Sequence, residues 1–145
     1  MRHLILIFIV FTFLSFRPQE RNWSDVKEGK DYRLMCKHVY HVIDERDYHY
    51  FVDTTIINDL SKANSLMTYL RSKINDKCDV WLYNNEKSEW LIRSQNKEAK
   101  EYVELADYCI AVSYADSIDF PRWYPLQDHV YKISGGKNWK NKTAP

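Results

Sequence analysis

The clearest pattern in this chain is a stripe of apolar residues at alternating spacings of four and three. Such spacing places one side chain per turn on the same side of an α-helix, which predicts an amphipathic helix packed on a core. Asp53 or Thr54 can cap its first turn, because their side-chain oxygens accept free backbone N–H groups there. The helix is expected to end near Asn75. Its stripe consists of Ile56, Leu60, Ala63, Met67, Leu70 and Ile74.

Segments rich in β-forming residues lie on both sides of this helix. Residues 33–43 and 48–52 are predicted to be strands, and the charged turn 44–47 would join them in a hairpin. Another strand is expected at 78–83, where successive side chains alternate between the two faces of a sheet. Its two sides differ in character, since Val80 and Leu82 would face the helix while Trp81 and Tyr83 would face away from it.

The second half of the chain is expected to add one more helix and two more strands. Its elements are read from cap residues, apolar spacing and the turn-forming Pro121 and Pro125. In order, they are a short extended piece at 90–93, a helix capped by Ser94 or Asn96 and ending at Tyr108, a strand at 109–114, a loop at 115–127 and a strand at 128–133.

The resulting order β-β-α-β-α-β-β predicts an α+β fold. Two helices and four or five short strands fit a two-layer sandwich, with a mostly antiparallel sheet and both helices on one face. The single domain would span residues 32–134. Residues 18–31 would be a linker and residues 135–145 a flexible tail.

The N-terminal segment 1–17 predicts where the protein works. Arg2 and His3 precede an apolar run from Leu4 to Phe16, whose length of about 20 Å as a helix falls short of the roughly 30 Å core of a bilayer. This combination is typical of a secretory signal peptide. We therefore expect a location outside the cytoplasm: secreted, periplasmic or envelope-associated. One alternative is an uncleaved N-terminal anchor, because the residues around Leu14 are mostly larger than a cleavage site prefers, and another is a segment of the folded core.

The charge balance argues against nucleic acid as a partner. The chain has 21 basic and 20 acidic side chains, and without Arg2 and Arg17 the balance is 19 to 20. Binding to a phosphate backbone depends on many lysine and arginine contacts, which a near-neutral domain does not offer.

The three cysteines, Cys36, Cys78 and Cys109, cannot all pair within one chain. One disulfide with a free thiol, or three buried thiols, would fit, and we favour the buried thiols. Cys36 and His38 would share one face of a strand, but structural metal sites usually have four ligands. No metal and no cofactor is therefore predicted.

Tyrosine and tryptophan are the chain's most unusual feature, with eleven and five copies. Such rings are frequent at contact surfaces. On the sheet face away from the helices they would form an aromatic platform suited to stacking on sugars or peptides. A second copy of the protein, as in a homodimer, or the chain's own segments could instead cover this face. The rings of this platform are Tyr40, Trp81, Tyr83 and Tyr131, with His38 and His129 beside them.

The loop between the last two expected strands is a second candidate site. Trp123 and Tyr124 lie there among Asp116, Asp119 and Asp128. Paired carboxylates can serve as acid and base in glycoside hydrolysis, so these aspartates are candidate catalytic groups.

We therefore expect a small exported domain that recognises a protein, a peptide or an envelope glycan through its tyrosine- and tryptophan-rich surface. One alternative is an extracytoplasmic hydrolase that uses the loop carboxylates. The other is a self-associating structural protein of the envelope. A membrane would be contacted only through the N-terminal segment, if that segment is not removed.

Overall fold

The computed structural model describes residues 28–41, 45–55, 57–74, 77–116 and 121–139. The expected leader 1–17, most of the expected linker and the candidate residue Asp119 lie outside these residues. The α+β class is confirmed, with a mostly antiparallel five-stranded sheet and four helices. The strands are β1 (Tyr32–Tyr40), β2 (Glu45–Val52), β3 (Cys78–Tyr83), β4 (Cys109–Ser113) and β5 (Arg122–Trp123). The helices are α1 (Leu60–Lys73), α2 (Ser88–Arg93), α3 (Ala99–Tyr108) and α4 (His129–Ile133).

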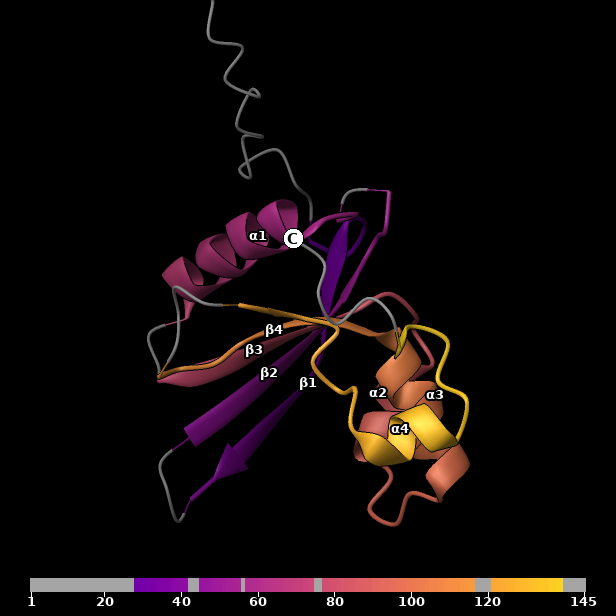
Figure 1. Ribbon diagram of the computed structural model, residues 1–145. Helices are drawn as coiled ribbons and strands as arrows, with labels where there is room; N and C mark the ends of the chain where they lie inside the picture. The colour runs from indigo at the N-terminus through magenta and orange to yellow at the C-terminus, as the bar shows by residue number, and fades with distance from the viewer. Residues whose placement is uncertain (1–27, 42–44, 56, 75–76, 117–120, 140–145) are drawn as a thin grey trace, which may run out of the picture.

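The strands are arranged in the sheet in the same order as in the chain. The β1–β2, β3–β4 and β4–β5 pairs are antiparallel, while β2 and β3 are parallel. A parallel pair needs a crossover connection, and α1 provides it. Between β3 and β4 the chain forms α2 and α3, and after β5 it forms α4 (Figure 1).

Helix α1 confirms the predicted apolar stripe but begins several residues later than expected. The Asp59 carboxylate accepts the Lys62 N–H at 2.8 Å and so caps the first turn. The Asp53 carboxylate instead accepts the Thr55 N–H at 2.8 Å, in a local turn before the helix. The buried side of α1 consists of Ala63, Leu66, Met67 and Leu70.

Two segments expected to be extended are helical. Residues 90–93 belong to α2, whose buried side chains Ser88, Leu91 and Ile92 follow helical spacing. Residues 128–133 form α4 with its cap, because the Asp128 carboxylate accepts the Tyr131 N–H at 2.8 Å. The strand predicted at 128–133 is therefore wrong. Conversely, the predicted loop 115–127 contains the short strand β5.

The helices lie on both faces of the sheet, which corrects the prediction that they share one face. Helix α1 packs on one face, where Leu66 shares a buried cluster with Val80. Helices α2 and α3 pack on the other, where Leu91 and Leu105 surround Tyr83 in a second cluster. Figure 1 shows α1 on one side of β3 and β4, and α2, α3 and α4 gathered near one end of the opposite side.

Helix α4 is fastened to α3 through a buried tyrosine. The Tyr131 hydroxyl donates to the Asp107 carboxylate at 2.7 Å and accepts the Asn138 N–H at 2.6 Å. Lys137 also donates its backbone N–H to Asp107, at 2.8 Å. Among the helices in the described ranges, none has the length and apolar character needed to cross a membrane.

Candidate functional site

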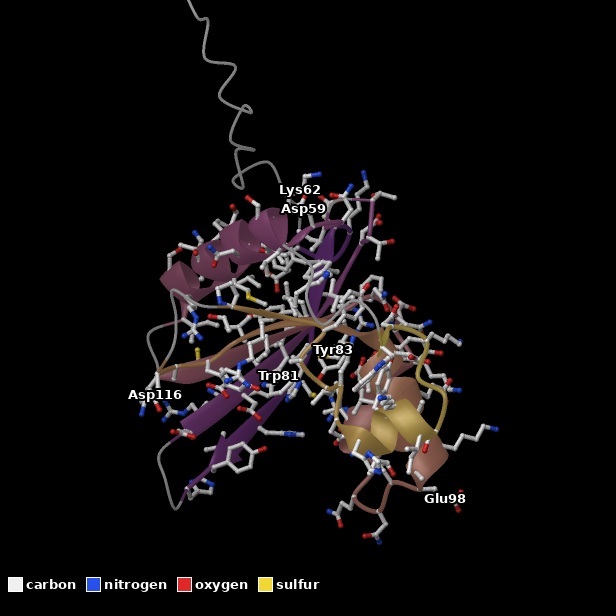
Figure 2. The ribbon with its side chains drawn as sticks, in the orientation of Figure 1. Asp59, Lys62, Trp81, Tyr83, Glu98 and Asp116 are labelled. Carbon is white, nitrogen blue, oxygen red and sulfur yellow. The ribbon has the colours of Figure 1, made fainter. Side chains whose placement is uncertain are left out.

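Helices α2 and α3 cover only part of their sheet face. The register of the strands places His38 beside Asp47, Asp47 beside Asp79, and His49 beside Trp81 on this face. Trp81 packs against the cluster formed by α2 and α3, whereas His38, Asp47, His49 and Asp79 are not part of that cluster. Figure 2 shows Trp81 on the side of the sheet opposite α1, with Tyr83 nearer the helices and Asp116 at the far end of the sheet. We call this region the open face and define it as His38, Tyr40, Asp47, His49, Asp79, Trp81 and Tyr114.

Two carboxylates lie side by side on the open face. Asp47 and Asp79 are register partners on adjacent parallel strands, whose backbones are about 4.8 Å apart. The Tyr40 hydroxyl donates to Asp47 at 3.1 Å, and the Ala115 N–H donates to Asp79 at 2.8 Å. Among the described residues, no lysine or arginine forms an ion pair with either carboxylate.

The environment of this pair disfavours its negative charge. Burial raises the pKa of both Asp47 and Asp79 above the ordinary value of an aspartate. The charge of Asp79 raises the pKa of Asp47 further, against the lowering effect of the Tyr40 hydrogen bond. A cation placed between the two carboxylates would therefore relieve an existing repulsion.

His49 lies buried next to the pair and is incompletely bonded. Its side chain is 7% exposed, and its Nδ1 lies 3.3 Å from the Tyr83 hydroxyl. Its Nε2 is 3.9 Å from an Asp47 oxygen, too far for a hydrogen bond, and has no partner in the described part of the chain. Burial, with the charges of His38 and Lys97, lowers the pKa of His49 to about 3. The imidazole is thus neutral at physiological pH.

Trp81 is held between neighbours on both sides. Its ring stacks beside that of His49, with centroids 6.0 Å apart and planes 22° apart. On the β4 side the Tyr114 ring meets it edge to face, with centroids 5.9 Å apart. Arg122 in turn lies over the Tyr114 ring, 5.2 Å from its centroid. These contacts partly bury the Trp81 ring, and its buried Nε1 has no partner among the described residues.

The predicted aromatic platform is only partly assembled. Trp81, Tyr83 and Tyr40 face away from α1 as expected, but Tyr83 is buried under α2 and α3. Tyr131 is not on the sheet, since it is buried in α4. His129 is likewise the first residue of α4.

The two aromatic candidates in the loop lie elsewhere. Trp123 and Tyr124 pack against the cluster on the α1 side of the sheet, so they share no surface with Trp81. Their rings contact each other edge to face, with centroids 5.1 Å apart. The two aromatic sites predicted from the sequence are therefore two separate surfaces.

The candidate catalytic aspartates have structural partners. Asp116 pairs with Lys77 at 3.0 Å on the surface. Asp128 caps α4 and accepts the Tyr102 hydroxyl at 2.8 Å, and these hydrogen bonds lower its pKa. A carboxyl with a lowered pKa is a poor general acid near neutral pH. Asp119 lies outside the described residues.

The cysteines are free and buried, in agreement with the favoured interpretation. Cys78 lies in the cluster on the α1 side, whereas Cys36 and Cys109 lie in the other cluster. Burial raises the pKa of Cys36 and Cys109, which makes them poor nucleophiles. Within the ranges that the structure describes, no three histidine, cysteine or acidic side chains are grouped to hold a metal ion.

Sequence reasoning missed Asp47, His49 and Asp79 as site residues. Asp47 was placed in a turn, although it belongs to β2 and alternates with His49 along that strand. The signal that could have found them is polar alternation in a strand that is otherwise buried. Their proximity depends on the parallel pairing of β2 with β3, which local sequence does not specify.

Comparisons with known proteins add no further identification. The chain matches no known family model, no curated protein and no solved structure.

Proposed function

We propose that this chain is a binding module whose open face recognises a basic segment of a protein or peptide. The observation that carries the proposal is the pairing of Asp47 with Asp79 at matched positions on β2 and β3. The charge of Arg71 already lowers the pKa of Asp79, but a lysine or arginine side chain between the two carboxylates would supply the ion pair that neither forms among the described residues.

The unpartnered atoms beside the pair support a ligand that also has backbone. His49 Nε2 and Trp81 Nε1 are buried without a hydrogen bond in the described part of the chain. An indole N–H can only donate, so it requires an acceptor, and a peptide carbonyl is a suitable one. A peptide therefore offers both the cation and the acceptor that this surface needs.

The position of Trp81 favours a peptide over a glycan. Stacking on a sugar requires an open flat ring, but His49 and Tyr114 lie beside the two sides of this ring. Contacts on two sides leave this partly buried ring less open than such stacking needs. The apolar run from Leu4 to Phe16 supports an encounter outside the cytoplasm.

Titration calorimetry with three probes would test the proposal. They are a nine-residue peptide with lysine at every second position, the same peptide with glutamate in place of lysine, and a neutral trisaccharide. We expect heat only from the lysine peptide, with an affinity that falls as salt is raised because the contact is electrostatic. Binding of the glutamate peptide or of the sugar alone would contradict the proposal.

Charge-neutral variants would locate the contact. Asp47→Asn and Asp79→Asn should each weaken binding of the lysine peptide about tenfold, and the double variant should weaken it further. Asp53→Asn is the matched control, because it changes the net charge equally and keeps the oxygen that accepts the Thr55 N–H. Equal effects of all three substitutions would mean that only overall charge matters and would refute a site on the open face.

Self-association through the open face is tested in the same samples. Sedimentation should give a monomer with and without the Asp47→Asn substitution. A wild-type dimer that this substitution dissociates would assign the surface to a second copy of the chain instead of a basic peptide.

A further inference from the structure

A second surface feature lies at the β5 edge of the sheet, where Arg122 lines it and also contacts Tyr114 of the open face. It is a hollow of about 570 Å³ between the start of α1 and the segment from Pro121 to Asp128. Leu60 lines its α1 side, and Trp123 and Tyr124 line its sheet side. A hollow of this size is in the range of small-molecule sites in proteins.

The wall of the hollow is held in a fixed conformation. Pro121 and Pro125 restrict the backbone on either side of the two rings. Tyr124 adopts a φ of 46°, in the left-handed region that large side chains rarely occupy. Its N–H donates to the Ile110 carbonyl at 2.8 Å, which ties this strained residue to β4. Strain of this kind is concentrated at ligand-binding sites.

One buried polar group in the wall is half satisfied. Gln127 is 3% exposed, and its Nε2 donates to the Asn138 carbonyl. Its Oε1 has no partner among the described residues, although Gln127 lines the hollow. A buried acceptor left without a donor is costly, so a ligand that supplies an N–H or O–H would gain from meeting it.

We infer that this hollow binds a flat aromatic ring that carries one N–H or O–H donor. The ring would lie against Leu60, Trp123 and Pro125, and its donor would bond to Gln127 Oε1. The inference does not rest on the proposed peptide site, because Trp123 and Trp81 pack against clusters on opposite sides of the sheet.

Indole and 1-methylindole are a matched pair of probes for this site. They differ in the donor and keep the same ring system. In titrations followed by amide resonances, both should shift those of Trp123, Tyr124, Leu126 and Gln127, and indole should bind about tenfold more tightly. Equal affinity of the two probes would overturn the role of Gln127, and unshifted resonances of these residues would overturn the site.

Variants of the protein provide a second measurement. Gln127→Met removes the acceptor while keeping similar volume, and it should reduce indole affinity to that of 1-methylindole. Trp90→Ala, at an exposed position on α2, should leave both affinities unchanged. If Gln127→Met disturbs the fold, the comparison of the two probes on the wild-type protein still decides. The Asp47→Asn and Asp79→Asn variants should bind indole normally, which separates this inference from the peptide site.

Discussion

Asp47 and Asp79 lie directly beside each other on parallel strands, and each has a pKa raised by burial. A group whose pKa is higher in the folded than in the unfolded protein is harder to ionise after folding. At neutral pH each carboxylate of the folded protein is either charged or protonated, and either state costs free energy relative to the unfolded chain. The pair therefore lowers the free energy of unfolding of the free protein, and binding of the proposed ligand would raise it again.

Replacing either carboxylate by an amide should stabilise the free protein. Asp47→Asn and Asp79→Asn should each raise the midpoint of thermal unfolding at pH 7, because the amide has no charge to desolvate. Below about pH 4 the difference should shrink, since the aspartates then bind protons in both the folded and the unfolded state. Scans at pH 7 and at pH 3.5 would measure this.

Asp53→Asn is again the control for this experiment, because Asp53 has a pKa lowered by hydrogen bonds to Thr55. Its substitution should give no stabilisation at pH 7. If Asp47→Asn and Asp79→Asn are less stable than the wild type at pH 7, the two carboxylates stabilise the free protein. The proposed cost of keeping this pair in the fold would then be wrong.

His49 should make the protein sensitive to mild acid. Its pKa is about 3 in the folded protein and near 6.5 when unfolded, so protons bind first to the unfolded chain. The stability it contributes is fully present above pH 6.5 and is lost as the pH falls from there towards 3. Between pH 7.5 and 5 this loss should be about 2 kcal/mol, at 1.36 kcal/mol per pH unit below 6.5.

Urea unfolding of the wild type and of His49→Phe would isolate this contribution. The variant is less stable overall because the Tyr83 hydroxyl loses one hydrogen-bond partner, but its free energy of unfolding should change less between pH 7.5 and 5. Identical pH dependence in the two proteins would show that His49 does not remain neutral in the fold.

The Tyr131 hydroxyl should contribute more to the free energy of unfolding than the hydroxyl of an exposed tyrosine. Tyr131→Phe leaves the buried Asp107 carboxylate without this donor and the Asn138 N–H without its acceptor, which should cost about 1–3 kcal/mol. Tyr102→Phe removes a hydrogen bond to exposed Asp128 and should cost less than about 1 kcal/mol. Chemical denaturation of both variants would compare them, and an equal cost would contradict the buried network.

The cysteines should react as buried thiols. A thiol reagent should modify the native protein slowly and should find three thiols after denaturation. A reductant should leave the unfolding midpoint unchanged. Fewer than three reactive groups in the denatured, unreduced protein would reveal a disulfide.

Sequence reasoning succeeded where one local pattern determines the structure. The stripe through Ala63, Met67 and Leu70 predicted α1, and the alternation in residues 78–83 gave the correct bounds of β3 and the correct side for Trp81. Both patterns report which side of an element is buried, and both elements lie in the core.

Sequence reasoning failed where the structure depends on short elements or on pairing between strands that are distant in the sequence. Helix α4 has five residues, too few for spacing to outweigh an apparent alternation, and its Asp128 cap was the better signal. The placement of helices on both faces depends on the crossover between β2 and β3. The site inherits this dependence, because Asp47 and Asp79 are 32 positions apart in the sequence and meet only through that pairing.

The identical order of strands in the chain and in the sheet has a consequence for biogenesis. Each new strand joins the growing edge of the sheet, and none has to insert between two strands already in place. A polypeptide that emerges gradually from a ribosome or a translocation channel can therefore assemble from its N-terminal end onward, with few intermediates that must be undone. Helix α4, which docks on α3 through Tyr131, would complete this assembly last.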